Sequence, residues 1–271
     1  MTEQETVSRM FEPRRELGRT GFQATALGIG DVADRAVPIE RCIATVRRAM
    51  DAGLNLVDTA PGYEHGYSEE VVGRAVREHL AAHGGRRGGL FVIDKIDFMD
   101  QPVAPQVDKS LGLLKLDGVD LFVFHALSDL ALWRQIASPG GAMDELAACV
   151  KAGKTRFRGI SSHHPDVLCE AIESGLCDVV MYPIGPFVDV LTERLPVRFP
   201  CDSRRRNGRG ATGDSRKKEG CRVFCRRLFC NAMDNSLDRE GAYHYTSLLL
   251  DGPFSCSQHP APSGAGLSLG L

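Results

Sequence analysis

The regular alternation of apolar runs with amphipathic segments over residues 1–190 constrains the fold of this 271-residue chain more than any other feature. Each run is short and rich in Ile, Val, Leu or Phe, and most are followed by a segment whose apolar residues recur with helical spacing. Runs that are apolar on both faces belong to parallel sheets that helices cover. The pattern therefore predicts an α/β fold with strands at residues 24–30, 55–58, 90–96, 119–125, 157–162 and 177–184.

The ends of the helical segments carry residues that start and stop helices. Pro38 suits the first turn of a helix over residues 38–53, and Gly53 suits its C-terminal cap. Ser68 is predicted to cap a helix over residues 69–83. The other predicted elements are a hairpin in residues 15–23 and helices through Val107 and Leu114, through Met143 and Val150, and over residues 165–175.

A parallel sheet of this kind is either open or closed into a barrel. An open dinucleotide-binding sheet would carry G-x-G-x-x-G directly after its first strand, whereas residues 28–34 read GIGDVAD and lack the third glycine. The sequence therefore favours a (β/α)8 TIM-type barrel. Only about six βα units are recognisable, so the barrel is expected to be incomplete in this chain.

Composition and charge exclude several classes of protein. Hydrophobic residues make up 43% and charged residues 25% of the chain, as in soluble globular proteins. The charged N-terminus lacks the apolar core of a signal peptide, and no apolar run is long enough to span a bilayer, so a cytoplasmic location without a membrane partner is expected. The net charge of −2 argues against a nucleic-acid partner. Apolar surroundings predict buried, reduced thiols at Cys42, Cys149, Cys169 and Cys177.

Three of the predicted strands end in ionisable residues of different kinds, namely Asp58, Lys95 and His125. Tyr63 follows Asp58 by five positions. Because the C-terminal ends of barrel strands meet at one face, the four side chains are predicted to share one pocket. Each also has an ordinary structural interpretation by itself: a turn-capping aspartate, a strand-end lysine, a core histidine and a rim tyrosine.

Together these four residue types suit one chemistry. A phenol with a pKa of about 10 is a poor acid at neutral pH, but an ammonium and an imidazole that donates a hydrogen bond both stabilise the phenolate. A carboxylate beside the lysine keeps the lysine charged and in place. Such a cluster can protonate a carbonyl oxygen while hydride reaches the carbon. We therefore predict an oxidoreductase that acts on a small carbonyl or alcohol substrate.

At four places the sequence resembles the aldo-keto reductases, a family of NADPH-dependent (β/α)8 barrels: RELGRTGFQATALGIG, NLVDTAPGYEHGYSEEVVGRAV, KSLGLLKLDGVDLFVFH and KAGKTRFRGISSHH. The resemblance covers roughly residues 13–190 and implies that Asp58, Tyr63, Lys95 and His125 are the catalytic tetrad of that family. It implies Tyr63 as the general acid, Lys95 and His125 as the residues that tune it, and Asp58 as the partner of Lys95. The implied cofactor is NADPH.

The same resemblance implies which residues contact the nicotinamide. Ser161 matches a residue that hydrogen-bonds the carboxamide, and Ser162 stands where many members have Asn, a change that a hydroxyl can tolerate. Met181 lies near where many members carry a Gln that contacts the same amide. His163 and His164 suggest a metal, but adjacent residues of a strand point to opposite faces, so no metal site is predicted.

The pattern stops after about residue 190. Ile and Val together number 28 in residues 1–190 and 2 in residues 191–271, and the net charge changes from −7 to +5. We therefore assign residues 13–190 to a barrel domain and residues 191–271 to an Arg-, Ser-, Gly- and Cys-rich tail that is expected to be disordered or irregular. Our hypothesis is that a shifted reading frame or a gene-model error produced this tail. Residues 221–225 and 242–250 are its candidates for a replacement strand.

The sequence thus predicts an oxidoreductase of the aldo-keto reductase type whose activity is expected to be impaired, since the units that would bind the far end of the cofactor are not recognisable. The alternative is a catalytically silent scaffold of the same family that senses cofactor or regulates a partner. Turnover distinguishes the two. The sequence assigns neither an oligomeric state nor a particular substrate, and it does not distinguish NADPH from NADH.

Overall fold

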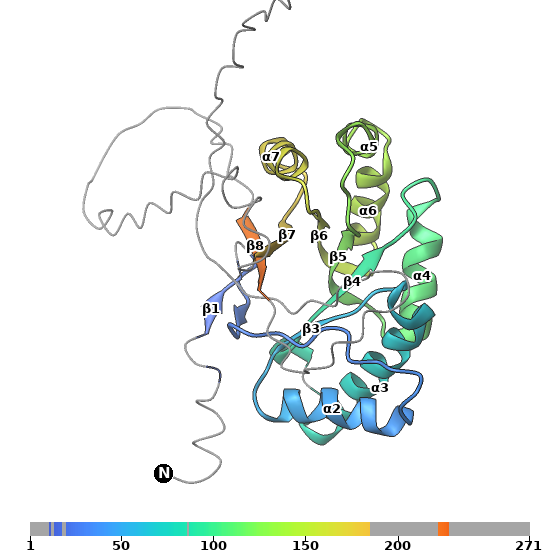
Figure 1. The fold of residues 1–271 in the computed structure, drawn as a ribbon, viewed down its shortest axis with the longest axis vertical. Helices are drawn as coiled ribbons and strands as arrows, with labels where there is room; N and C mark the ends of the chain where they lie inside the picture. Colours follow the sequence, from blue (N-terminus) through green and yellow to red (C-terminus); the bar gives the residue numbers. More distant parts are fainter. Residues whose placement is uncertain (1–10, 12–13, 18–19, 86, 185–221, 228–271) are drawn as a thin grey trace, which may run out of the picture.

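The central element of the fold is a parallel sheet whose six strands follow one another in chain order, β3-β4-β5-β6-β7-β8. The computed structural model describes residues 11, 14–17, 20–85, 87–184 and 222–227. Helices connect the strands from β3 to β7 and lie on the convex side of the curled sheet (Figure 1). This is the (β/α)8 TIM-type architecture, incomplete within the described residues, and it confirms the predicted fold class.

The elements have the following bounds. The strands are β1 (Arg15–Glu16), β2 (Gln23–Ala24), β3 (Leu56–Asp58), β4 (Phe91–Ile96), β5 (Val119–Phe124), β6 (Thr155–Ser161), β7 (Val179–Ile184) and β8 (Arg222–Arg227). The α-helices are α2 (Ile39–Asp51), α3 (Tyr67–Ala82), α4 (Val103–Leu114), α5 (Leu130–Ile136), α6 (Ala142–Lys151) and α7 (Pro165–Ser174). Two short 3-10 helices are η1 (Tyr63–Gly66) and η2 (Arg87–Gly89).

The strands from β3 to β7 present alternate residues to two separate cores. One core lies between the sheet and the helices and includes Val92 and Ile96 of β4. The other lies inside the curl of the sheet, where Phe91 and Ile93 pack with Phe22 of the N-terminal hairpin. A residue that continues the inner row past the C-terminal end of a strand therefore points into the mouth of the barrel.

The predicted N-terminal hairpin is present, because β1 pairs antiparallel with β2. The predicted strand over residues 24–30 is wrong in extent, since it meets β3 through an isolated bridge between Ile29 and Val57. A side chain explains the interruption. The Thr25 N–H donates to Asn55 Oδ1 at 2.8 Å, so it is not available for a backbone ladder.

Helix α3 begins at Tyr67, and the prediction that Ser68 caps it is wrong. The cap position is Gly66, whose φ of +86° suits glycine. Ser68 is buried in the first turn, where its hydroxyl accepts a hydrogen bond from Thr59 Oγ1 at 3.0 Å. This contact with the end of β3 takes the hydroxyl away from the helix terminus.

Two elements were not firmly predicted from the sequence: one was not expected at all, and the other was one of two candidates for a replacement strand. Helix α5 was not predicted; its cap, Asp129, accepts a hydrogen bond from Leu132 N–H at 2.9 Å, and its Trp133 is buried. Strand β8 pairs in parallel with β7 and overlaps residues 221–225, one of the two candidates for a replacement strand. The other candidate, residues 242–250, lies outside the described residues.

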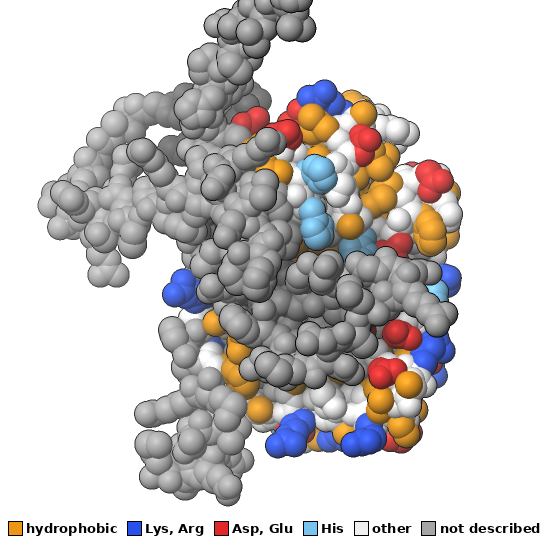
Figure 2. Space-filling model, in the orientation of Figure 1, with side chains coloured by type: hydrophobic (Ala, Val, Ile, Leu, Met, Phe, Trp, Pro, Cys, Tyr) orange, Lys and Arg blue, Asp and Glu red, His pale blue; other side chains and the backbone are white. Residues whose placement is uncertain are grey.

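The surface and the thiols of the described residues agree with the composition. Cys42, Cys149 and Cys177 are buried, as predicted, whereas Cys169 is half-buried and not fully buried as expected. In the view of Figure 2, acidic and basic side chains are interspersed among the described residues. No helix in the described part of the chain combines the length and the apolarity needed to cross a membrane.

Helices α3 and α4 approach each other closely at Gly73. A Cβ added at this glycine would lie 2.1 Å from the backbone oxygen of Leu114 and 2.5 Å from its Cα. Backbone atoms of a packed helix cannot move aside without disturbing their neighbours, so the contact requires glycine. The exposed Gly112 of α4 differs, because an added Cβ there meets no atom within 4 Å.

We predict that Gly73→Ala lowers the free energy of unfolding by about 2 kcal/mol or more, because the added methyl collides with Leu114. Gly112→Ala is the matched control and should raise stability by up to about 1 kcal/mol, the gain in helix propensity. Denaturant titration followed by circular dichroism measures both values. Unchanged stability of Gly73→Ala would contradict the close approach of the two helices.

Candidate active site

The C-terminal ends of β3, β4 and β5 bring Asp58, Lys95 and His125 to the mouth of the barrel. Strand alternation determines this position, because Lys95 continues the inner row of Phe91 and Ile93. The parallel register then places Asp58 beside Ile93 and Lys95 beside Val123. Three residues that are distant in sequence therefore become neighbours through the pairing of the strands.

Lys95 is buried and held by the end of β3. Its Nζ donates to Asp58 Oδ1 and Oδ2, both at 2.9 Å, and to the backbone oxygen of Thr59 at 2.7 Å. The Lys95 side chain is 0% exposed and that of Asp58 is 7% exposed. A buried ammonium is tolerated only when it is paired and hydrogen-bonded, and here three oxygen atoms satisfy it.

Tyr63 lies directly against this pair. Lys95 Nζ is 4.3 Å from the centroid of the Tyr63 ring, and the Tyr63 and His125 rings meet edge to face with centroids 5.5 Å apart. The next two residues, Glu64 and His65, have left-handed φ values of +47° and +54°, which non-glycine residues rarely adopt. The structure thus brings all four predicted tetrad residues together, and a tight turn follows the tyrosine.

Asp97 is a further member of the cluster that the sequence analysis missed. His125 Nδ1 lies 2.6 Å from Asp97 Oδ1. Burial opposes ionisation of Asp97, yet the hydrogen bond with His125 and the charge of Lys95 hold the pKa of its carboxyl below the usual value. The sequence did contain one indication of this role. Residues i and i+2 of an extended segment share a face, and Asp97 follows Lys95 by two positions.

The environment of His125 favours the neutral imidazole. Burial lowers the pKa of His125, and the nearby Lys95 adds to the decrease, whereas Asp97 opposes it. Because the Asp97 carboxylate can only accept, His125 Nδ1 carries the proton of this hydrogen bond. The Nε2 atom of a neutral ring then carries a lone pair. It becomes a donor only when the imidazole is protonated.

The two serines predicted to contact the cofactor occupy different positions. Ser161 ends β6 beside the tetrad, and its hydroxyl accepts a hydrogen bond from Ala126 N–H at 2.8 Å. Ser162 is buried, and its hydroxyl accepts from His164 N–H at 3.0 Å. Alternation places Ser162 in the row of Ile160, which faces the helices. The structure therefore brings Ser161, but not the Ser162 hydroxyl, toward the tetrad.

Two more carboxyl groups, also missed in the sequence, are buried on the other face of β4. Glu69 of α3 and Asp94 of β4 are both 0% exposed, and the Ser110 side chain and the Asp94 carboxyl lie beside the carboxyl of Glu69. Burial raises the pKa of Glu69 to about 7; Asp97 adds to the shift, while Ser110 and Lys109 oppose it.

Asp94 shows the same effect. Burial and the neighbouring Glu69 raise the pKa of Asp94 well above its usual range, although Lys95 opposes the shift by its N–H, 2.7 Å from Asp94 Oδ1, and by its charge. Two carboxylates that are both buried and close together cannot both ionise cheaply. The pair therefore retains at least one proton near neutral pH. The sequence did indicate a buried carboxyl here, because Asp94 lies inside the apolar run VIDKI.

A cavity of about 440 Å³ adjoins the cluster between α4 and the loops that follow β3 and β4. Gly62, Glu69, Asp97, Phe98 and Lys109 are among the residues that line it, and none of the four tetrad residues does. Asp97 contacts both the cavity and His125, so it lies at the boundary between this space and the catalytic cluster.

Fold and site together define the class of protein. A parallel barrel whose strand ends gather an aspartate, a lysine, a histidine and a loop tyrosine has the arrangement expected of an aldo-keto reductase. Residues 25–185 match the sequence profile of the Aldo/keto reductase family, and the chain belongs to this family of oxidoreductases.

Curated proteins similar to this chain include the NADH-specific methylglyoxal reductase of Escherichia coli, 30% identical over 60% of this chain and 54% of that protein. The aldo-keto reductase YhdN of Bacillus subtilis is 31% identical over 53% and 45% of the two chains. This chain spans about half the length of the curated relatives it matches.

Solved structures show the same fold. A Pseudomonas aeruginosa protein provisionally assigned as an aldo-keto reductase is similar with a TM-score of 0.56 and 25% identity, over 70% of this chain and 76% of that one. An aldo-keto reductase from Klebsiella pneumoniae in complex with NADPH has a TM-score of 0.50 and 23% identity, over 64% and 58%. Because the sequence identity to the K. pneumoniae protein is only 23%, this comparison shows similarity of fold alone.

We predict that stability falls as the pH rises from about 4.5 to 7, because Glu69 keeps its proton up to about pH 7 in the folded chain and releases it near its ordinary value of 4.5 when unfolded. Over this range the folded state binds more protons, so raising the pH favours unfolding. Glu69→Gln should reduce the slope and raise the melting temperature at pH 8. Thermal unfolding at pH 5, 6, 7 and 8 measures both effects.

Glu70→Gln is the matched control, because Glu70 is the next residue of α3 and is exposed. It should leave the dependence of melting temperature on pH unchanged. An equal slope in Glu69→Gln and in the wild type would show that Glu69 does not hold the extra proton.

Proposed function

We propose that this chain transfers hydride between NADPH and a small carbonyl or alcohol substrate, with Tyr63 as the general acid. The observation that carries the proposal is the buried Lys95 ammonium, paired with Asp58 and 4.3 Å from the centroid of the Tyr63 ring. An ammonium in this position stabilises the phenolate that remains after Tyr63 gives its proton to a carbonyl oxygen. Membership of the Aldo/keto reductase family supports the reaction class.

His125 has a role that depends on its protonation state. In the neutral ring, Nδ1–H is donated to Asp97 and Nε2 can accept a proton or a hydrogen bond, for example from an alcohol. In the protonated ring, Nε2–H can donate to the oxygen of a carbonyl. The protonated form thus assists reduction, and the neutral form assists oxidation. Asp97 acts through His125 and is a positioning residue.

Ser161 is the residue we place against the nicotinamide carboxamide. A carboxamide presents both a donor and an acceptor, and a hydroxyl at the end of β6 can match either. Ser162 is the weaker candidate, because its hydroxyl is bonded to the backbone of His164. When bound, the cofactor supplies the hydride. The E. coli relative is named as NADH-specific and the K. pneumoniae structure holds NADPH, so NADPH is part of the proposal.

We predict that Tyr63→Phe lowers turnover by at least about 100-fold and leaves cofactor binding within about twofold of the wild type. Removing a general acid costs on the order of 10²- to 10⁴-fold in rate, whereas the ring and the Lys95–Asp58 pair remain. Cofactor fluorescence measures binding of NADPH and of NADH to the full chain, and a panel of small aldehydes measures turnover. Tyr67→Phe is the control, since Tyr67 starts α3 and should leave turnover unchanged.

The same measurements separate the competing interpretations. Binding without turnover in the wild type would identify a silent scaffold and contradict the proposed enzyme. Absence of both would show that the chain forms no cofactor site. Turnover retained in Tyr63→Phe would remove the tyrosine from its proposed role and leave the reaction class standing.

We also predict that Asp97→Asn shifts the pH profile of carbonyl reduction. The rate of reduction should fall as the pH rises through the pKa of His125, which lies below its usual value of 6.5. Asp97 opposes that decrease, so its replacement by a neutral amide moves the fall to a lower pH. Values of kcat/KM measured over pH 5–8 report the shift. Asp100→Asn, at an exposed position of the same loop, is the control, and an unshifted profile in Asp97→Asn would contradict the role of Asp97.

A further inference from the structure

Two histidines face an aspartate at the end of the barrel opposite the catalytic cluster. His79 lies in the last turn of α3 and His83 caps that helix four residues later, so both point to one side. Asp51 is the last residue of the neighbouring α2. One nitrogen or oxygen atom of each residue lies within 4.8 Å of those of the other two.

We propose that Asp51, His79 and His83 bind a divalent transition-metal ion of the Zn²⁺ class. Imidazole nitrogen and carboxylate oxygen are the ligands that such ions prefer when no thiolate is present. Two ligand atoms around a tetrahedral ion lie about 3.4 Å apart, given metal–nitrogen distances of about 2.0–2.1 Å. The three ligand atoms now lie within 4.8 Å of one another, and rotation of the exposed side chains of Asp51 and His83 would bring them to the separation that the ion requires. Water completes the coordination.

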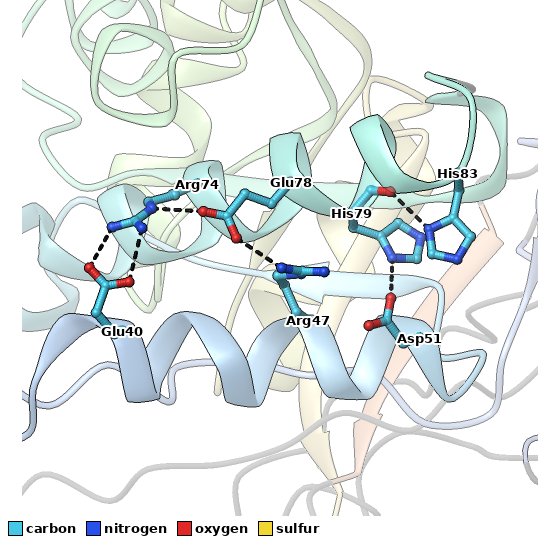
Figure 3. A network of polar contacts seen from close by, with 7 residues as sticks. All are labelled: Glu40, Arg47, Asp51, Arg74, Glu78, His79 and His83. Carbon is cyan, nitrogen blue, oxygen red and sulfur yellow. Dashed lines mark hydrogen bonds and ion pairs between the residues drawn. The ribbon is translucent and has the colours of Figure 1, made fainter.

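The hydrogen bonds of His79 and His83 indicate which contacts a bound ion would replace (Figure 3). His79 Nδ1 lies 2.8 Å from Asp51 Oδ1, and His83 Nδ1 lies 2.9 Å from the backbone oxygen of His79. The two imidazole rings stack with centroids 4.2 Å apart. A metal ion can replace the proton that lies between His79 and Asp51, and His83 then turns from a carbonyl to the ion. The proton displaced from Nδ1 of a neutral His79 ring moves to Nε2, and the ion uses groups that already face one another.

A chain of ion pairs holds the two helices in register beside this site (Figure 3). Arg74 of α3 contacts both carboxylate oxygens of Glu40 at 2.9 Å and Glu78 at 2.8 Å, and Glu78 reaches Arg47 of α2 at 3.1 Å. The contacts advance along both helices in the same order and end at His79 and Asp51. The backbone that carries the ligands is therefore already in place, so binding orders little beyond the side chains.

The position at two helix ends also favours a cation. The C-terminal ends of helices carry unpaired carbonyl groups and a partial negative charge. Asp51 and His79 both lie in the last turns of their helices. A bound ion would join α2 to α3 at the N-terminal face of the barrel and stabilise the folded chain in proportion to its affinity. This role is independent of the proposed reaction.

The test is a titration of the full chain with Zn²⁺ after alkylation of the accessible thiols with iodoacetamide, because cysteines also bind zinc. Calorimetry should give one ion per chain, and Zn²⁺ should raise the melting temperature until EDTA is added. His83→Ala and Asp51→Asn should each weaken binding at least tenfold. Unfolding without metal verifies that the variants are folded. His163→Ala is the control, an exposed histidine outside the site whose loss should leave the affinity unchanged.

Two results would overturn the proposal. The first is no binding by the alkylated wild type, because this outcome assigns any ion bound before alkylation to cysteine thiols. The second is equal affinity in the wild type and in His83→Ala.

Discussion

The pairing of the Lys95 ammonium with Asp58 is the interaction on which the arrangement of the site depends. A charge at 0% exposure inside a barrel is costly unless hydrogen-bond acceptors surround it, and two carboxylate oxygens and one backbone carbonyl do so here. These acceptors lie at the end of β3, so the pair is satisfied only in one register of β3 against β4. The loop that leaves β3 then carries Tyr63 over the ammonium. The need to satisfy one buried charge thus couples the pairing of strands to the position of the proposed acid.

Strand β4 carries ionisable groups on both faces, and the cost of burying them is offset in a different way on each face. Lys95 faces inward and is neutralised by an ion pair, whereas Asp94 faces the helices and meets Glu69, another acid. Two buried acids avoid the cost of ionisation by retaining a proton, so this face is stable only while the pair stays partly protonated. Asp94 also accepts the N–H of Lys95. The protonation of the outer pair is therefore linked through the backbone to the residue that holds the proposed site together.

The sequence was sufficient wherever periodicity or position along a strand determined the outcome. The runs that became β3 to β7, and the helices α2, α4, α6 and α7, follow from local apolar spacing. Asp58, Lys95 and His125 follow from the convergence of strand ends. Contacts between distant segments were not predictable in the same way: Ser68 lost its capping role to Thr59, and residues 24–30 were interrupted by Asn55. Strand spacing relates Asp97 to Lys95, but its contact with His125, like that of Glu69 with Asp94, joins elements that are distant in sequence and was therefore missed.

The strands that carry the proposed site determine which of its functions, proton transfer or cofactor binding, an incomplete barrel would lose. The proposed proton-transfer cluster lies on β3, on β4 and β5 with the residues that directly follow them, and on the loop after β3, and its hydrogen bonds join these elements directly. The proposed nicotinamide contact lies on β6, and the resemblance to the family implies that the contacts with the adenosine end come from units that follow β7 in the chain. In the proposed reaction, proton transfer therefore depends on local pairs, whereas cofactor affinity is expected to depend on units later in the chain. If those units are altered, the expected defect is a raised KM for the cofactor, while proton transfer in the bound complex is preserved.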